Sequence, residues 1–129
     1  MRKLLALVVV LVIAACGARS APATLNGAAN SMVTVPVTIT NAGTTTWQPG
    51  AFNASYHLYT QSGTLLVWDG LRTALPAAVP PGQAVTLNAS VMTPASAGSY
   101  VLRFDVVQEG VAWFSGQGVP MGSVTLQAQ

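Results

Sequence analysis

The sequence predicts an all-β protein: a single antiparallel β-sandwich of about seven strands, preceded by a signal-peptide helix. Three observations predict it. Apolar and polar residues alternate with a period of two along most of the chain after residue 31. Glycine and proline clusters interrupt this alternation at regular intervals. No stretch after residue 16 places apolar residues at helical spacing, so short strands and turns must form the core.

The N-terminal residues are typical of an export signal. Arg2 and Lys3 give a basic start, and an unbroken apolar run, LLALVVVLVIAA, follows from Leu4 to Ala15. A helix needs about 20 apolar residues to cross a bilayer, and this run is too short for that. Residues 1–15 are therefore predicted to be a signal peptide.

The end of this run carries a more specific pattern. Ile13-Ala14-Ala15-Cys16-Gly17 resembles the lipobox of bacterial lipoproteins, in which an aliphatic residue and two small residues precede a cysteine. The resemblance implies cleavage between Ala15 and Cys16 and lipidation of Cys16 with fatty acyl chains such as palmitate. Cys16 is the only cysteine of the chain, and an unpaired cysteine in an exported protein needs such a reason. The alternative is an ordinary signal peptide with an incidental cysteine.

Lipidation would place the protein on the cell envelope, outside the cytoplasm, with the membrane as its first partner. Two or more acyl chains give a stable anchor, whereas one gives only marginal binding. The lipoprotein resemblance, with Gly17 after the cysteine, implies the outer membrane if the cell has one, and otherwise the outer face of the plasma membrane. Residues 16–30, small and polar, are expected to be the lipidated cysteine and a flexible tether, and residues 31–129 the domain.

The charge pattern excludes nucleic acid as a partner. The formal net charge is +2, and Arg2 and Lys3 account for all of it. From Cys16 onward three arginines balance three acidic residues, and there is no lysine. Nucleic-acid binding requires clustered basic residues, so the mature chain lacks the necessary surface.

The strands follow from the alternation, segment by segment. They are expected at 32–40, 54–60, 65–68, 71–75, 84–92, 100–108, 111–115 and 123–126. Pro36 cannot donate to a β-ladder, which predicts an edge strand or a bulge at that position. Tyr56 and Leu58 are predicted to face the core and His57 the opposite side. Asp105 is expected on an outer strand face, paired with Arg103 at the surface.

Four segments in order resemble a known family of domains. They are 41–50 (NAGTTTWQPG), 79–83 (VPPGQ), 94–100 (PASAGSY) and 109–114 (EGVAWF). This series resembles the immunoglobulin-like domains of bacterial surface proteins and, in pattern, the four-tryptophan domain of autophagy cargo receptors, although this chain has three tryptophans. The resemblance covers residues 32–127 and implies a binding or spacer module. Gly98-Ser99-Tyr100 also has the arrangement of a tyrosine corner, which makes Tyr100 structural.

Catalytic and metal-binding patterns are not found in the sequence. His57 is the only histidine, and no Gly-x-Ser-x-Gly elbow accompanies it. We expect His57 to be a surface or rim residue, with an esterase or protease built on it as the competing hypothesis. Zinc sites need several histidine or cysteine ligands. The chain is thus predicted not to be an enzyme and to need no metal or cofactor.

The aromatic residues near turns are the remaining candidates for recognition. Trp68, Trp113 and Phe114 are candidates for ligand contact, whereas Trp47 is expected to pack in the core; the alternative is that all three tryptophans fill the core. The function predicted is that of a membrane-anchored, non-catalytic, extracytoplasmic binding or scaffold module that contacts an envelope protein. The alternative is a carbohydrate-binding lipoprotein whose exposed tryptophans contact a glycan.

Overall fold

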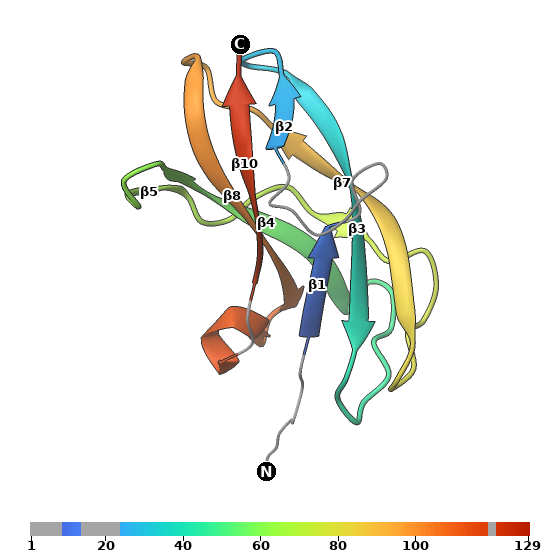
Figure 1. Cartoon of the computed structure of the whole chain (residues 1–129). Coiled ribbons are helices and arrows are strands. Elements are labelled where there is room, and N and C mark those ends of the chain that lie inside the picture. Colours follow the sequence, from blue (N-terminus) through green and yellow to red (C-terminus); the bar gives the residue numbers. More distant parts are fainter. Residues whose placement is uncertain (1–8, 14–23, 119–120) are drawn as a thin grey trace.

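The chain folds into two β-sheets packed face to face (Figure 1). The computed structural model describes residues 9–13, 24–118 and 121–129. The elements of this described part are β1 (Val9–Ile13), β2 (Thr24–Gly27), β3 (Met32–Asn41), β4 (Phe52–Thr60), β5 (Leu65–Val67), β6 (Thr73–Ala74), β7 (Ala84–Met92), β8 (Gly98–Gln108), β9 (Ala112–Trp113), the 3-10 helix η1 (Phe114–Gln117) and β10 (Gly122–Ala128).

The smaller sheet has the strand order β1-β3-β7, and the larger has the order β2-β10-β8-β4-β5, with β6 on β4 and β9 on β8. All of these neighbours are antiparallel except β2 and β10, which run parallel. The predicted immunoglobulin-like β-sandwich is confirmed. The parallel pair arises because no hairpin joins β2 to β10: the chain leaves β2 for the other sheet and returns with its last strand.

The alternation in the sequence sets the two faces of each strand. β3 pairs with β7 in continuous register from Met32–Met92 to Thr40–Ala84. On the outer face of this pair the hydroxyls of Thr38 and Thr86 lie 2.8 Å apart in a hydrogen bond. On the inner face, apolar side chains are withdrawn from water, which is the main favourable term in folding. These are Val35, Val37, Ile39, Leu87, Ala89 and Val91.

One end of the core is an aromatic cluster. Trp47 is fully buried, as predicted, and its ring centroid lies 5.6 Å from that of Phe114 and 6.3 Å from that of Phe52. The predicted tyrosine corner is also present, because the hydroxyl of Tyr100 donates to the carbonyl oxygen of Ser96 at 2.6 Å. Tyr100 is therefore structural.

The N-terminal part of the domain differs from expectation at two places. Val9–Ile13 forms strand β1, paired with Val37–Asn41, rather than the predicted helix. Its sequence, VVLVI, is rich in β-branched residues that favour strands, and β3 offers it an unpaired edge. Within the segment expected to be a tether, Thr24–Gly27 forms strand β2, which adds to the edge of β10, and Leu25 packs against the core.

Pro36 has no backbone N–H, and it lies at a position where this removes no hydrogen bond to β1. β1 pairs only with Val37–Asn41, so Pro36 lies beyond the end of β1 and keeps β7 as its neighbour. The prediction of an edge strand or a bulge is wrong for β3 as a whole, because β3 is the middle strand of its sheet and pairs with β7 without a register shift.

Candidate functional site

Two segments cover the outer face of the larger sheet over β4 and β8. The first is the loop 68–72 between β5 and β6. The backbone N–H of Gly70 donates to the carbonyl oxygen of Tyr56 on β4 at 3.2 Å. A Cβ atom at Gly70 would lie only 2.5 Å from that oxygen. Only glycine allows the loop to approach β4 this closely. The close approach brings Trp68 and Arg72 next to the sheet.

The second covering segment is the hairpin from β8 to β9. It turns at Gly110, whose φ of 75° favours glycine. The turn is closed by the N–H of Val111, which donates to the carbonyl oxygen of Gln108 at 2.9 Å. Trp113 then lies in register with Val107 on β8. The hairpin therefore places Trp113 over the same sheet face as Trp68.

Beneath these segments lies a buried polar network centred on His57 and Asp105. His57 is 0% exposed and Asp105 is 2% exposed. Nε2 of His57 lies 2.8 Å from Oδ2 of Asp105, and Nδ1 donates to the carbonyl oxygen of Trp68, which can only accept. Asp105 also accepts from the N–H of Val106 at 2.8 Å and from the N–H and Oγ of Ser115 at 3.1 and 2.5 Å. Both groups are therefore fully hydrogen-bonded.

This network corrects two predictions. His57 is not a surface or rim residue, and Asp105 pairs with it rather than with Arg103. The guanidinium of Arg103 instead lies over the ring of Tyr59, 4.6 Å from its centroid. The alternation places these side chains on the outer face correctly, but it carries no information about the segments that later cover that face.

The aromatic rings above the network have a fixed arrangement. The rings of His57 and Trp68 are stacked, with centroids 3.7 Å apart and an interplanar angle of 11°. Trp113 stands across both, its centroid 5.6 Å from that of Trp68 at 62° and 4.7 Å from that of His57 at 59°. Trp68 remains 40% exposed and Trp113 is half-buried. The two indoles thus meet at an angle and form a partly solvent-accessible corner.

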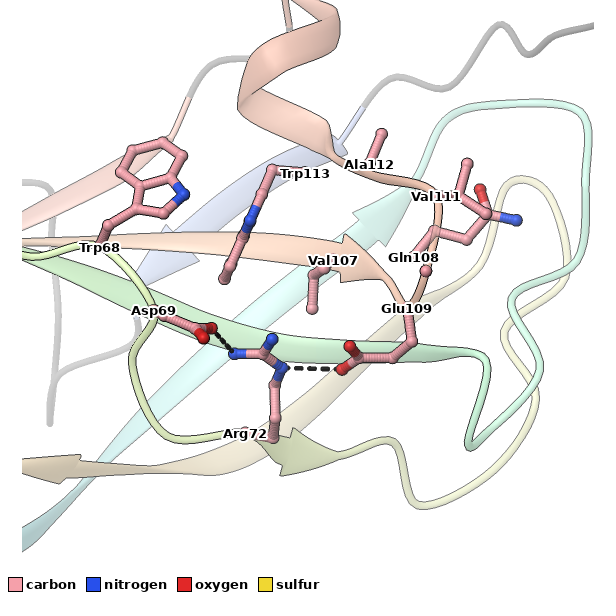
Figure 2. A pocket seen from close by; sticks show the side chains of 10 residues that line it. Trp68, Asp69, Arg72, Val107, Gln108, Glu109, Val111, Ala112 and Trp113 are labelled. Atoms are coloured by element: carbon pink, nitrogen blue, oxygen red, sulfur yellow. Dashed lines mark hydrogen bonds and ion pairs between the residues drawn. The ribbon is translucent and has the colours of Figure 1, made fainter.

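Arg72 closes one side of this corner (Figure 2). Its guanidinium lies 5.0 Å from the centroid of the Trp113 ring, with Nη1 2.6 Å from Oδ1 of Asp69 and Nε 2.7 Å from Oε2 of Glu109. Glu109 also accepts from the amide of Asn53 at 2.8 Å. The bond with Arg72, followed by that with Asn53, lowers the pKa of Glu109, and the same bond raises the pKa of Arg72.

These residues surround an open cavity of about 330 Å³, which we call the Trp68–Trp113 pocket. Small-molecule sites occupy roughly 300–1,000 Å³, so the pocket lies at the lower end of that range. Apolar walls and polar groups converge in it: Trp68, Asp69, Arg72, Val107, Gln108, Glu109, Gly110, Val111, Ala112 and Trp113.

The structure brings together two of the three predicted ligand-contact residues, Trp68 and Trp113. Phe114 must be removed from that set because it is 1% exposed and its ring packs in the core against Trp47 and Phe52. Cys16, the predicted lipidation site, lies outside the described residues, as does Ala15 on the other side of the predicted cleavage point.

Sequence reasoning missed Asp69, Arg72 and Glu109 as site residues. The scarcity of charged residues in the domain could have pointed to these three. Residues 24–129 contain five charged side chains, of which these three and Asp105 lie at or beneath the pocket. Asp69 and Arg72 also follow Trp68 within one short loop.

Within the residues described, no three histidine, cysteine, aspartate or glutamate side chains gather as metal ligands. No helix in the same residues is both long and apolar enough to span a membrane.

Together these features define the class of protein as an immunoglobulin-like β-sandwich with an aromatic pocket on the outer face of its larger sheet. No protein-family model matches the sequence, and no curated protein matches it.

The solved structures that are similar to this chain include the following three. The solution structure of the CARDB domain of a Pyrococcus furiosus protein has a TM-score of 0.47 and 16% identity, over 97% of both chains. The crystal structure of the sporulation control protein Spo0M from Bacillus subtilis has a TM-score of 0.51 and 8% identity, over 96% of this chain and 50% of Spo0M. A family 123 glycoside hydrolase from Clostridium perfringens has a TM-score of 0.43 and 8% identity, over 82% of this chain and 22% of the enzyme.

At such identities these similarities concern the fold alone. This chain corresponds to about half the length of Spo0M.

Proposed function

We propose that this chain is a lipid-anchored, non-catalytic binding module of the cell envelope that recognises a carbohydrate through the Trp68–Trp113 pocket. The observation that carries the proposal is the fixed, partly exposed corner of two indoles beside polar side chains. The face of a sugar ring is lined by C–H groups and its rim by hydroxyls. An aromatic surface suits the face, and amide and carboxylate groups suit the rim.

Two features support a non-catalytic role. In a catalytic triad the histidine contacts the nucleophile, whereas here both nitrogens of His57 are occupied and the hydroxyl of Ser115 donates to Asp105. Glycoside hydrolysis needs a carboxylic acid with a raised pKa, and the pKa of Glu109 is lowered by Arg72. These arrangements suit holding a ligand rather than transforming it.

The envelope location rests on the N-terminal sequence. The basic start, the apolar run and Cys16 after two alanines support export followed by lipidation. On this proposal β1 belongs to the leader and leaves with it, so that β3 becomes an edge of the smaller sheet in the mature protein. Residues 17–23 would then separate the lipid from the first strand of the domain, β2.

A second candidate function, contact with an envelope protein, is supported by a different surface. Strand β5 ends the strand order of the larger sheet, and its Leu65 and Leu66 are 48% and 47% exposed. A terminal strand presents unpaired backbone groups to which a partner strand can add. Crosslinking in the native cell through a photoreactive residue at Leu66 would test this candidate, because a specific protein adduct is expected only if β5 is an interface.

The carbohydrate proposal is tested by titrating the full-length chain, in detergent, with β-1,4-linked glucose and N-acetylglucosamine tetrasaccharides while following tryptophan fluorescence. We expect a saturable change, because Trp68 and Trp113 would be shielded from water. Trp68→Ala and Trp113→Ala should each weaken binding by roughly fivefold to thirtyfold, since loss of a central aromatic contact costs about 1–2 kcal/mol.

Tyr59→Ala is the matched control, because Tyr59 is an aromatic residue of β4 that does not line the pocket. Its affinity should equal that of the unmodified chain. Absence of any fluorescence change at millimolar sugar, or an equal loss of affinity in Tyr59→Ala, would contradict the proposal.

A further inference from the structure

The charges around the Trp68–Trp113 pocket have an excess of one negative charge. The charged residues that line it are Asp69, Arg72 and Glu109. Beneath the pocket His57 and Asp105 pair with each other and add no net attraction for an anion. The local field therefore favours a neutral or positively charged ligand over a negatively charged one.

Arg72, the cation at the pocket, already has two carboxylates as partners, and only the N–H groups of its Nη2 have no hydrogen-bond partner among residues 24–118 and 121–129. Its Nε donates to Glu109, and its Nη1 donates to Asp69 and to the carbonyl oxygen of Gly70. Its guanidinium also lies over Trp113. An acidic ligand would have to compete for this guanidinium with two carboxylates that are already in place.

The two carboxylates, in contrast, keep acceptor capacity. Across residues 24–118 and 121–129, Asp69 receives hydrogen bonds through Oδ1 and Glu109 through Oε2. Oδ2 of Asp69 and Oε1 of Glu109 thus have free lone pairs, and the side chain of Asp69 is 72% exposed. Each of these oxygens can accept from a ligand group that donates hydrogen bonds and carries positive charge.

The indoles favour the same kind of group. A cation over the face of tryptophan is attracted by the negative potential of the ring, and tryptophan is the strongest of the aromatic residues in this respect. Trp113 already attracts the guanidinium of Arg72 at 5.0 Å. Trp68, stacked on His57 at one face, is 40% exposed and can offer its other face to a ligand.

We infer that the pocket selects saccharides that carry a free, protonated amino group over neutral and acidic saccharides of the same length. The inference rests on the proposed carbohydrate-binding function and names the chemistry that the site prefers. The sugar face would pack on an indole while its ammonium group donates to Asp69 or to Glu109, which lie on either side of Arg72 (Figure 2).

The test compares four β-1,4-linked tetrasaccharides on the full-length chain in detergent, at a pH at which the amine is protonated. They are the glucosamine, N-acetylglucosamine, glucose and mannuronic acid tetramers. We expect the glucosamine tetramer to bind about fivefold to tenfold more tightly than the two neutral ones. The acidic tetramer should bind most weakly, and added salt should reduce the preference.

Asp69→Asn removes a carboxylate while keeping its shape, so the ratio of the affinities for the amino and neutral tetramers should fall toward one. Arg103→Gln changes a charge outside the pocket and should leave that ratio unchanged. Equal binding of the amino and neutral sugars, or tighter binding of the acidic one, would overturn this inference and leave the proposed function intact. If none of the four sugars binds, both are overturned.

Discussion

The His57–Asp105 pair connects the two segments that build the pocket to the sheet beneath them. His57 holds the loop 68–72 through the carbonyl oxygen of Trp68, and Asp105 holds η1 through Ser115. Each residue belongs to a different strand, β4 or β8. This buried contact therefore holds the loop that carries Trp68 and the helix that follows Trp113, in addition to the close approach at Gly70 and the turn at Gly110.

Removing one member of the His57–Asp105 pair should lower the free energy of unfolding. In Asp105→Ala the buried imidazole and the backbone N–H groups of Val106 and Ser115 lose their acceptor. A buried polar group left without a partner costs about 1–3 kcal/mol, and here three such groups lose theirs. We expect a decrease of this size in the free energy of unfolding, measured by urea denaturation.

Asp69→Ala serves as the control because Asp69 also pairs with an arginine but lies at the surface. Exposed ion pairs contribute less than about 1 kcal/mol. Equal losses of stability in the two variants would show that the buried network does not stabilise the domain as described.

The sequence predicts on which side of the sheet His57 lies, but it does not predict that His57 is buried. The alternation in 54–60 places it opposite Tyr56 and Leu58, and the structure confirms that side. Burial depends on a loop and a hairpin that arrive from elsewhere in the chain, and a period of two contains no such information. For the same reason the sequence pairs Asp105 with Arg103, its neighbour in the chain, whereas the fold pairs it with His57, its neighbour in space.

Among the elements, strands with strong alternation were predicted almost to the residue, whereas short elements were missed. The expected 84–92 is β7 as observed, and 32–40 is β3 without its last residue. The four residues of β2 lack an apolar alternation, and η1 is a single turn of FSGQ. Such elements form because a sheet edge or a packed neighbour is available to them, which the local sequence does not reveal.

The loop 68–72 should be sensitive to the addition of a single methyl group. In Gly70→Ala the new Cβ would lie 2.5 Å from the carbonyl oxygen of Tyr56 and 2.9 Å from its ring. The loop must then move away from β4, at a cost of about 1–3 kcal/mol, and carry Trp68 with it. We expect a lower midpoint of thermal unfolding and weaker sugar binding, measured by circular dichroism and fluorescence titration.

Gly116→Ala provides the comparison, because a Cβ at Gly116 would meet nothing within 4 Å. Its stability should lie within about 0.5 kcal/mol of the unmodified chain. If the two alanine variants unfold at the same temperature, the close approach of the loop to β4 does not position Trp68.

At the scale of the whole molecule, the proposed lipid anchor would carry a domain of low charge. Residues 24–129 carry five charged side chains, so polar uncharged groups must provide most of the solvation. A protein with a net charge near zero tends to associate in free solution. Attachment to a membrane through Cys16 would limit that tendency and hold the pocket near envelope glycans.

The anchor is tested by Cys16→Ser, which removes the thiol that the proposed lipidation requires. The variant should leave the membrane fraction and lose labelling by a fatty-acid analogue, while Ser20→Ala, just outside the lipobox pattern, should stay anchored and labelled. Mass spectrometry that finds an unmodified thiol at Cys16, in a chain that retains its leader, would contradict the lipoprotein proposal.

The central claim, that the two indoles at the surface form a carbohydrate site, is tested most directly by nuclear magnetic resonance of the three indole N–H groups. Trp47 is 0% exposed in the core and serves as an internal reference for Trp68 and Trp113. On titration with the glucosamine and glucose tetramers, the signals of Trp68 and Trp113 should shift saturably while that of Trp47 stays in place. Signals of Trp68 and Trp113 that remain unmoved at millimolar sugar would contradict the account.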